Sequence, residues 1–290
     1  MKLGLVLEGG GSRTYFTCGV LDCFLEEGTY ADYVIGTSAG IANGVSYVSR
    51  QKGRNLEIAT RFLNDKRYMG FKHLVNPNNK SYYNIKFVYE EIPNKHIPFD
   101  FKEFEKFEGD VVSVVTNVKT GQAEYLKMPR DDKSFVHLVA SCALPIMFPL
   151  IEIDGMKYMD GGICDPIAVD EALRNDCDKV IVVLTREKGY VKEEEKALKL
   201  CAKLYRKYPE FSKALLDRTR VYNEKLKRVW ELEEEGRVFV IGPKDVSGCK
   251  RTERNLDVIN SLYNQGMDVA REAMPKLKEY LKLHIEKEKA

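Results

Sequence analysis

Two strand–glycine turn–helix units follow one another within the first 50 residues, and this repetition constrains the fold more than any other feature. The first unit joins the apolar run Leu3–Leu7 to a helical pattern through Gly9–Gly11. The second joins Tyr33–Ile35 to a helical pattern over 41–50 through Gly36–Gly40. Short buried strands that alternate with helices form parallel sheets with helices on both faces. The sequence therefore predicts an α/β fold with a mainly parallel central sheet.

The rest of the chain continues this alternation and ends in a helix-rich segment. A β-rich run at 110–118, a hairpin around Asp154-Gly155 and a buried run at 179–184 extend the sheet. Later helices are predicted at about 193–208, 212–235, 255–273 and 276–288, with a strand at 238–241. We expect one domain over 1–185 and a helix-rich C-terminal extension over 186–290 that packs on the same domain.

The composition excludes several classes of protein. A formal net charge of +2 gives no reason to expect a nucleic-acid partner. Seven cysteines without a CxxC pair or a Cys/His cluster argue against a disulfide framework and a structural metal. The first apolar run stops at Gly9, which is too short for a signal peptide, and no apolar stretch approaches a membrane span. We expect a cytoplasmic protein whose membrane contact, if any, is peripheral at the inner membrane surface.

The C-terminal third carries an excess of basic over acidic side chains. The stretch 196–208 places Lys199, Lys203 and Arg206 near one another on a helical pattern. Such a face can bind an anionic membrane surface, and an ordinary solvated helix face is the alternative. The sequence leaves both interpretations open.

The segment Gly36-Thr37-Ser38-Ala39-Gly40 has the G-x-S-x-G pattern of a nucleophile elbow. A serine on a tight turn between a strand and a helix has an exposed hydroxyl. The flanking Gly36 and Gly40 suit such a turn because a Cβ would clash there. The helix that follows aims its N-terminus at developing negative charge. Because the pattern lies between a predicted strand and a predicted helix, Ser38 is a candidate nucleophile.

A serine needs a base to take its proton, and the four histidines are poor candidates. They are His73, His96, His137 and His284. Asp160 leaves the predicted hairpin and precedes Gly161-Gly162, so its carboxylate can project from a tight loop. Partial burial would raise its pKa above the usual value of about 3.9 and make it a better base. The alternative is a turn aspartate that bonds its own backbone.

The loop Gly9-Gly10-Gly11-Ser12-Arg13 can bind an anion. Successive glycines at a helix start leave backbone N–H groups free to point at negative charge, and Arg13 adds a fixed positive charge. This suits either an oxyanion hole or a phosphate. A dinucleotide loop would have glycine where Thr14 stands, and no P-loop pattern occurs, which argues against a nucleotide enzyme.

Taken together, these motifs resemble the patatin-like phospholipase family. The family carries a glycine-rich oxyanion loop, a G-x-S-x-G elbow and a D-G-[GA] motif in this order, and Ala140–Pro145 also looks familial. The resemblance covers about residues 3–185 and implies a three-layer α/β/α sandwich with 1–185 as the catalytic domain. It looks closest to bacterial members with an extra helical C-terminal segment.

By the same resemblance, Ser38 is the nucleophile and Asp160 the general base. Residues Gly9, Gly10, Gly11 and Arg13 would form the oxyanion hole. The implied reaction is hydrolysis of fatty-acyl esters through an acyl-enzyme, with no metal or organic cofactor. Thr14 departs from the family pattern, which usually has glycine there. Either the loop is helical at this position and tolerates Thr14, or the oxyanion site is altered.

Three functions from different classes remain. The first is a lipid acyl hydrolase, which accounts for Ser38 and Asp160 together. The second is a catalytically weak or inactive lipid- or protein-binding relative with the same fold, for which Thr14 is the argument. The third is a nucleotide-binding protein that uses the Gly9–Gly11 loop and leaves Asp160 unexplained.

Overall fold

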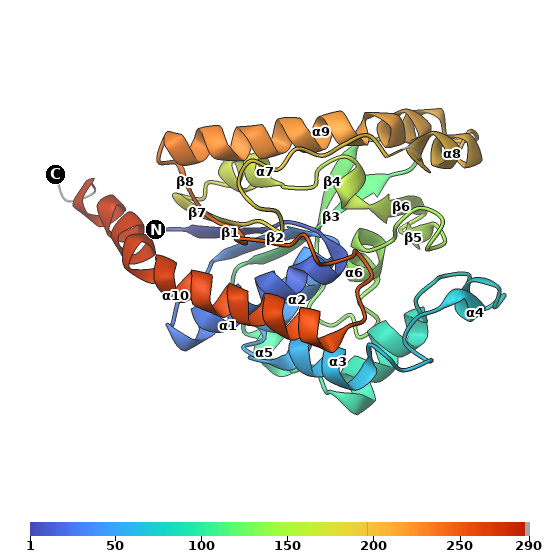
Figure 1. Cartoon of the computed structure of the whole chain (residues 1–290), viewed down its shortest axis with the longest axis horizontal. Helices are drawn as coiled ribbons and strands as arrows, with labels where there is room; N and C mark the ends of the chain where they lie inside the picture. Colours follow the sequence, from blue (N-terminus) through green and yellow to red (C-terminus); the bar gives the residue numbers. More distant parts are fainter. Residues whose placement is uncertain (196, 288–290) are drawn as a thin grey trace.

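Five parallel strands form the centre of a sheet that helices cover on both faces (Figure 1). The computed structural model describes residues 1–195 and 197–287, with side chains as far as Lys282. The strands run in the order β5-β6-β3-β2-β1-β7-β8, with β4 paired to β3. They are β1 (Leu3–Leu7), β2 (Tyr33–Thr37), β3 (Asp110–Asn117), β4 (Ala123–Lys127), β5 (Ile151–Ile153), β6 (Met156–Asp160), β7 (Lys179–Val183) and β8 (Val238–Ile241).

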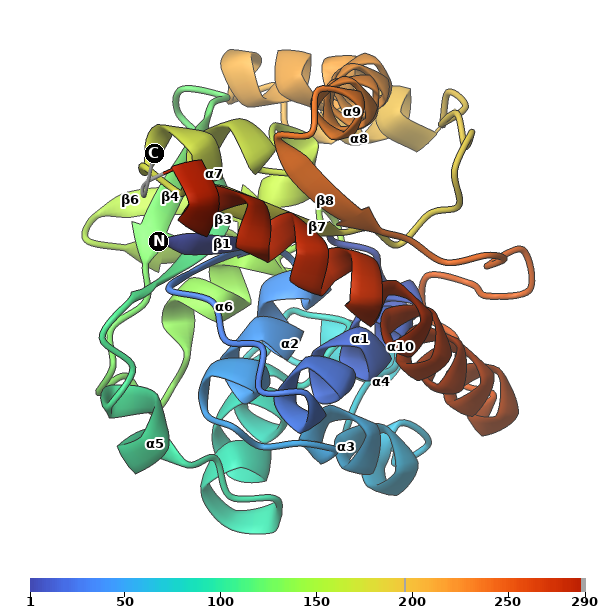
Figure 2. The same ribbon diagram turned by 90° about the vertical axis from the view of Figure 1, so that its left-hand side faces the viewer.

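The helices divide between the two faces of the sheet. Helices α1, α2 and α10 cover one face, and α7 and α9 cover the other (Figure 2). Strand β1 shows why, because Leu5 and Leu7 pack into the first layer while Val6 between them packs into the second. The predicted α/β/α sandwich with a mainly parallel sheet and a helical C-terminal segment is confirmed.

The helices have the following bounds. They are α1 (Tyr15–Glu26), α2 (Ala39–Val48), α3 (Arg54–Phe62), α4 (Phe71–Leu74), α5 (Phe101–Glu105), α6 (Val136–Ser141), α7 (Val169–Arg174), α8 (Ala197–Leu204), α9 (Pro209–Glu234) and α10 (Leu256–Lys287). The 3₁₀ helices η1 (Gly11–Thr14) and η3 (Gly161–Ile163) and the π-helical η2 (Phe87–His96) complete the set in the described residues.

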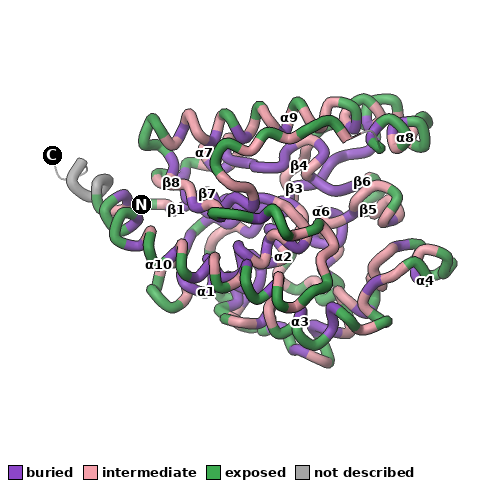
Figure 3. The backbone as a smooth tube through the Cα atoms, in the orientation of Figure 1, coloured by how far each residue is buried: buried purple, intermediate pink, exposed green. Residues whose placement is uncertain are grey.

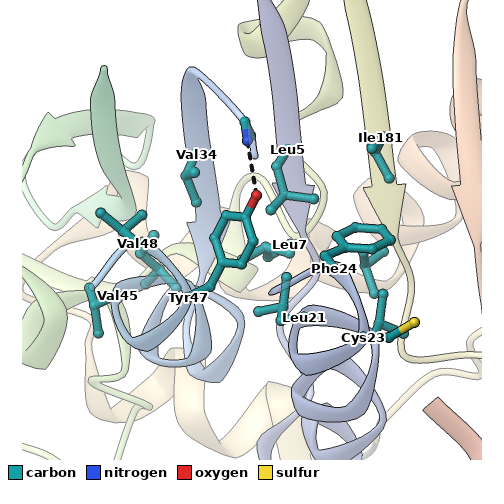
Figure 4. Close-up of a cluster of buried hydrophobic side chains, with 14 of the residues drawn as sticks. Leu5, Leu7, Leu21, Cys23, Phe24, Val34, Val45, Tyr47, Val48 and Ile181 are labelled. Atoms are coloured by element: carbon teal, nitrogen blue, oxygen red, sulfur yellow. Dashed lines mark hydrogen bonds between the residues drawn. The ribbon is translucent and has the colours of Figure 1, made fainter. Parts of the chain in front are cut away.

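The core beneath β1 and β2 fixes the ends of these strands. Leu5 and Leu7 of β1 meet Leu21 and Phe24 of α1 in a cluster of fully buried side chains (Figure 4). The phenol of Tyr47 also closes this layer, because it accepts a hydrogen bond from the Ala31 N–H at 2.9 Å. The strands at the centre of the sheet are among the most buried segments of the chain (Figure 3). The turns that follow β1 and β2 therefore start from rigid positions.

The pairing of β3 brings two distant parts of the chain together. Strands β2 and β4 both pair with Val112–Val114, so they flank β3 on opposite sides. Strands β4 and β6 both pair with Val115, so β6 lies on the side of β2, beyond its end. Thr37 is opposite Val114, and Asp160 is opposite Val115. The carboxyl end of β6 therefore meets the turn that begins at Ser38.

The helices differ from the predicted pattern in three places. Helix α10 is continuous through Pro275, although the pattern predicts two helices. A proline inside a helix costs roughly 3 kcal/mol, but Met274 and Leu277 on either side of it are buried, and this packing keeps the helix whole. Helix α8 is shorter than the predicted 193–208, and the pattern did not indicate α7.

Some sequence predictions fall outside what the structure describes. Lys196, the first residue of the basic stretch, is not among the described residues, nor is the side chain of His284. Across residues 1–195 and 197–287, none of the helices has the length and apolar character needed to cross a membrane. Strand β8 joins the sheet beside β7, but the division of the chain at residue 185 stays a prediction.

Candidate active site

The turn between β2 and α2 holds Ser38 in an unusual backbone conformation. Its φ is 55° and its ψ is −132°. Such a conformation costs on the order of 1–3 kcal/mol and persists only where the surroundings impose it. A Cβ on Gly36 would lie 2.8 Å from the Ile41 backbone nitrogen, and one on Gly40 would lie 2.6 Å from the Glu8 carbonyl oxygen. The segment therefore has the strained geometry of a nucleophile elbow, with glycine required on both sides.

Ser141 fixes this turn through hydrogen bonds. The sequence did not single out this residue. Its hydroxyl accepts a hydrogen bond from the Ser38 N–H at 2.9 Å and donates one to the Val114 carbonyl at 2.7 Å. Ser141 is fully buried at the end of α6. It therefore links the Ser38 turn to β3, and its place in the stretch Ala140–Pro145 was the available signal.

Asp160 ends β6 with one carboxylate oxygen bonded and the other free. Its Oδ1 accepts from the Gly162 N–H at 2.8 Å, while the buried Oδ2 has no hydrogen-bond partner among the described residues. Burial raises the pKa of Asp160 above its ordinary value, and the nearby Ser38 hydroxyl and Arg218 guanidinium lower it in part. The Ser38 hydroxyl lies near the carboxylate, but it forms no hydrogen bond with Oδ2. A buried carboxylate with a free oxygen can accept a proton.

The glycine loop after β1 lies against Ser38. A Cβ on Gly9 would be 3.1 Å from the Ser38 Cβ and 2.9 Å from the Thr37 carbonyl oxygen. Thr185 fixes the loop from behind, because its hydroxyl donates to the Gly9 carbonyl at 3.0 Å. Gly10 packs on the same threonine, with only 2.7 Å between its would-be Cβ and the hydroxyl oxygen. The loop predicted to bind an anion therefore borders the candidate nucleophile.

Thr14 has an ordinary helical backbone. This favours a loop that tolerates Thr14 over an altered oxyanion site. Its φ is −70° and its ψ is 0°, and its hydroxyl donates to the Gly11 carbonyl at 2.8 Å. A β-branched residue fits such a conformation without strain. Gly11, at φ 57°, is where this loop uses the left-handed region instead. Thr14 therefore leaves the path of the glycine loop intact.

Two charged residues flank the loop, and only one of them was predicted. Arg13 lines the cavity with its buried Nε unpaired among the described residues, and burial lowers the pKa of its guanidinium. Glu8, which no sequence motif singled out, is buried with both carboxylate oxygens bonded. One accepts from the Thr185 N–H at 2.6 Å and the other from the Tyr222 hydroxyl at 2.7 Å. Glu8 therefore ties the loop to β7 and α9, and burial raises its pKa.

These residues open into one cavity of about 620 Å³. Ser38, Asp160 and the glycine loop lie in its wall. One part of the wall is apolar and comes from α2, α3, η2, α6 and the residues next to η2 and α6, with Val45, Ile58, Val88, Phe99, Phe135 and Leu138 among its side chains. Another part is polar and carries several arginines. The space suits an elongated molecule with an apolar chain and a polar end.

None of the three histidines with described side chains lines this cavity. His73 is buried and its Nε2 bonds the Lys66 carbonyl at 3.0 Å. His96 packs beside Phe62 and Phe87 with ring centres 5.5 and 5.6 Å away. Burial lowers the pKa of His137. Nor do the described residues bring three or more His, Cys, Asp or Glu side chains together in a metal-binding group.

Comparison with known proteins gives matches to both halves of the chain. The family of patatin-like phospholipases matches residues 5–173, and a domain of unknown function (DUF6363) matches residues 208–282. The uncharacterized protein YjjU of Escherichia coli (strain K12) is 26% identical over 188 residues, which are 63% of this chain and 52% of that protein. Lysophospholipase nte1 of Aspergillus niger is 25% identical over 186 residues, 63% of this chain and 12% of that protein.

The chain therefore spans about half the length of the first of these relatives and a much smaller part of the second. Among solved structures, VipD from Legionella pneumophila matches with a TM-score of 0.41 at 13% identity, over 94% of this chain and 67% of that chain. The patatin-like match covers more than half of this chain and includes the glycine loop, Ser38 and Asp160. The chain belongs to the patatin-like phospholipase family.

Proposed function

We propose that this protein is a serine acyl hydrolase that cleaves fatty-acyl esters of lipids through a Ser38–Asp160 dyad. The observation that carries the proposal is the pairing of β6 with β3, which sets the buried Asp160 carboxylate beside the strained turn of Ser38. Membership of the patatin-like phospholipase family supports a lipid ester as the substrate, as does the name of the fungal relative, a lysophospholipase.

In the proposed reaction, Asp160 accepts the proton of the Ser38 hydroxyl as the oxygen attacks the ester carbonyl. The N–H groups of Gly10 and Gly11 donate to no acceptor in the described chain, so they are available to the oxyanion, with Arg13 nearby. Asp160 then gives its proton to the departing alcohol. A water molecule that the same carboxylate deprotonates hydrolyses the acyl-enzyme and releases the fatty acid.

The alternative is a catalytically weak or inactive lipid- or protein-binding relative. Its basis in the sequence is Thr14, and the helical backbone at this residue removes the steric objection to an intact loop. A lipid-class hydrolysis panel distinguishes the two, with wild type and Ser38→Ala assayed on a phospholipid, a lysophospholipid, a monoglyceride and a water-soluble ester. We expect fatty-acid release by wild type alone. A folded wild-type protein inert toward all four would favour the inactive relative.

The raised pKa of Asp160 predicts the acid side of the pH–rate profile. Asp160 must be deprotonated to act as a base, and burial favours its protonated form. The value of kcat/KM for a water-soluble ester should therefore rise with pH through an apparent pKa above the usual value of about 3.9. A profile that is flat down to pH 4 in a protein that stays folded would contradict a buried carboxylate base.

We also propose that the protein is cytoplasmic and contacts the inner membrane surface peripherally through α8 and through the arm formed by residues 66–86, which carries α4. On α8, the exposed Leu200 and Leu204 lie among exposed lysines. The arm exposes Phe71 and Val75. Residues 66–86 and 197–208 contain several basic side chains and no acidic one, which suits an anionic surface.

The loop between α6 and β5, residues 142–150, contacts both the arm and the segment just after α8. The ring of Phe71 packs on Tyr82 at 5.5 Å, and the Tyr82 N–H donates to the Met147 carbonyl at 2.7 Å. The neighbouring Ile146, which is half exposed, donates its N–H to the Tyr205 hydroxyl just after α8 at 3.2 Å. Since Tyr83 and Phe148 beside this loop line the cavity, the exposed apolar residues lie near its wall.

This contact predicts salt-sensitive vesicle binding. Because screening weakens charge attraction, binding to anionic vesicles should fall sharply with added salt. The double variant Lys199→Glu/Lys203→Glu should bind at least about tenfold more weakly, whereas Lys227→Glu, an exposed lysine on α9, should bind like wild type. Sedimentation with vesicles measures this. Equal binding to neutral and anionic vesicles at low and high salt would contradict the contact.

A further inference from the structure

Five cationic side chains line the cavity on the side of α9 and of the segments next to β7 and β8. They are Arg13, Arg186, Lys192, Arg218 and Arg251. Four of the five lie outside residues 5–173, and Arg218 and Arg251 fall within the domain of unknown function at 208–282. This C-terminal part of the chain therefore contributes directly to the wall of the candidate active site.

Among the described residues, Glu195 alone forms ion pairs with these cations. Glu195 serves three of them, with its Oε1 2.5 Å from Lys192 Nζ, 3.7 Å from Arg251 Nη2 and 3.9 Å from Arg218 Nη1. Arg13 and Arg186 form no ion pair with any side chain in the described part of the chain. The other carboxylates of this wall are Glu8, whose oxygens are already bonded, Asp160, and the exposed Glu193 and Glu194.

The cations also repel one another. Burial lowers the pKa of Arg13, and the charges of Arg186 and Arg251 lower it further, while the charge of Glu8 offsets part of this effect. Burial lowers the pKa of Arg218 as well, and Arg251 adds to this effect. Positive groups that are held together away from bulk water favour an anion among them.

The cluster is fixed next to the reacting groups. The Arg251 carbonyl accepts from the Ser12 N–H at 2.8 Å, which attaches it to the glycine loop. Arg218 donates from Nε to the Gly162 carbonyl at 3.1 Å, two residues from Asp160. An ester held at Ser38 with its acyl chain along the apolar wall would therefore have its alcohol portion close to these cations.

We propose that Arg186, Arg218 and Arg251 form a phosphate-binding subsite, and that the substrate is an acyl ester whose headgroup ends in a phosphate monoester. This rests on the proposed acyl hydrolase function. Arginine binds phosphate oxygens through paired N–H donors, and a phosphate monoester carries a charge of about −1.5 to −2 at pH 7. A choline or ethanolamine headgroup would add a cation to a cluster that already repels itself. A neutral glyceride would bring no anion to these arginines.

Matched lipids test the proposal in micelles of a neutral detergent, which keep the charge of a membrane out of the comparison. The three substrates are 1-oleoyl glycerol 3-phosphate, 1-oleoyl lysophosphatidylcholine and 1-oleoyl glycerol. We expect wild type to have the highest kcat/KM on the first. Arg186→Gln and Arg251→Gln should each lower the ratio of kcat/KM for the phosphate lipid to that for the glyceride by about tenfold or more, the scale of a lost charge-assisted contact. Arg220→Gln, an exposed arginine on α9, should keep the wild-type ratio.

A binding measurement separates this proposal from the proposed function and identifies the source of the phosphate. Calorimetry should show that glycerol 3-phosphate binds wild type, that Arg186→Gln and Arg251→Gln weaken this binding about tenfold or more, and that inorganic phosphate binds less tightly. Equal kcat/KM on the three lipids, or a ratio that both variants leave unchanged, would overturn the subsite. Tight binding of inorganic phosphate without a preference for the phosphate lipid would overturn its assignment to a headgroup. If no ester were hydrolysed while glycerol 3-phosphate bound through these arginines, the hydrolase function alone would fail.

Discussion

Asp160→Asn should slow ester hydrolysis by about two orders of magnitude or more, the usual scale for the loss of a general base. Asparagine has nearly the same shape, so this change removes the charge and the proton-accepting oxygen with little change in packing. Because burial disfavours the charged carboxylate, the neutral side chain should not lower the unfolding temperature. Ser38→Ala should abolish hydrolysis, and the double variant should be no worse than Ser38→Ala, since a nucleophile and its base act as one unit. Steady-state kinetics on a water-soluble ester measures all three.

The histidines provide the control for this prediction. Replacing His73, His96, His137 and His284 one at a time should leave activity largely intact in variants that fold. None of the three with described side chains lines the cavity, and His73 and His96 bond or pack elsewhere. A histidine variant as inactive as Ser38→Ala, together with an active Asp160→Asn, would replace the dyad with a histidine-dependent mechanism.

Gly9→Ala should have the second largest effect. The new methyl group would lie 2.9 Å from the Thr37 carbonyl oxygen and 3.1 Å from the Ser38 Cβ, so the glycine loop or the elbow must move. Since the loop is proposed to stabilise the oxyanion, we expect kcat to fall by about 10²–10³-fold, the scale for losing one oxyanion-hole donor. The value of kcat on a soluble ester measures this, with the unfolding temperature recorded alongside.

Gly248→Ala is the matched control for this change. Nothing lies within 4 Å of a Cβ at Gly248, and its φ is not in the left-handed region. It should retain wild-type activity. If Gly9→Ala were as active as Gly248→Ala, the glycine loop would not be the oxyanion hole.

Local patterns in the sequence account for much of the fold. Short apolar runs such as Leu3–Leu7 and Tyr33–Ile35 are buried on both faces of a parallel sheet, so they stand out from their surroundings. The turns after them need glycine for steric reasons that act within a few residues, as at Gly36 and Gly40. Patterns of this kind predict the order of strands and helices along the chain and the position of Ser38.

What the sequence could not supply depends on contacts between distant residues. The closeness of Asp160 to Ser38 comes from the register of β3, which pairs with both β2 and β6. Ser141 and Glu8 matter through bonds to residues far along the chain, and the sequence around them does not show which residues they bond. Helix α10 continues through Pro275 because buried neighbours hold it, which outweighs a local rule.

Mapping the site of a fluorophosphonate adduct tests the central claim most directly. The probe forms a covalent bond with an activated serine, and mass spectrometry of the digested protein identifies the modified residue. We predict one adduct per chain, on Ser38, with labelling slowed about a hundredfold or more in Asp160→Asn and absent in Ser38→Ala. An adduct on another residue, or labelling of Ser38 at the wild-type rate in Asp160→Asn, would contradict a Ser38–Asp160 dyad.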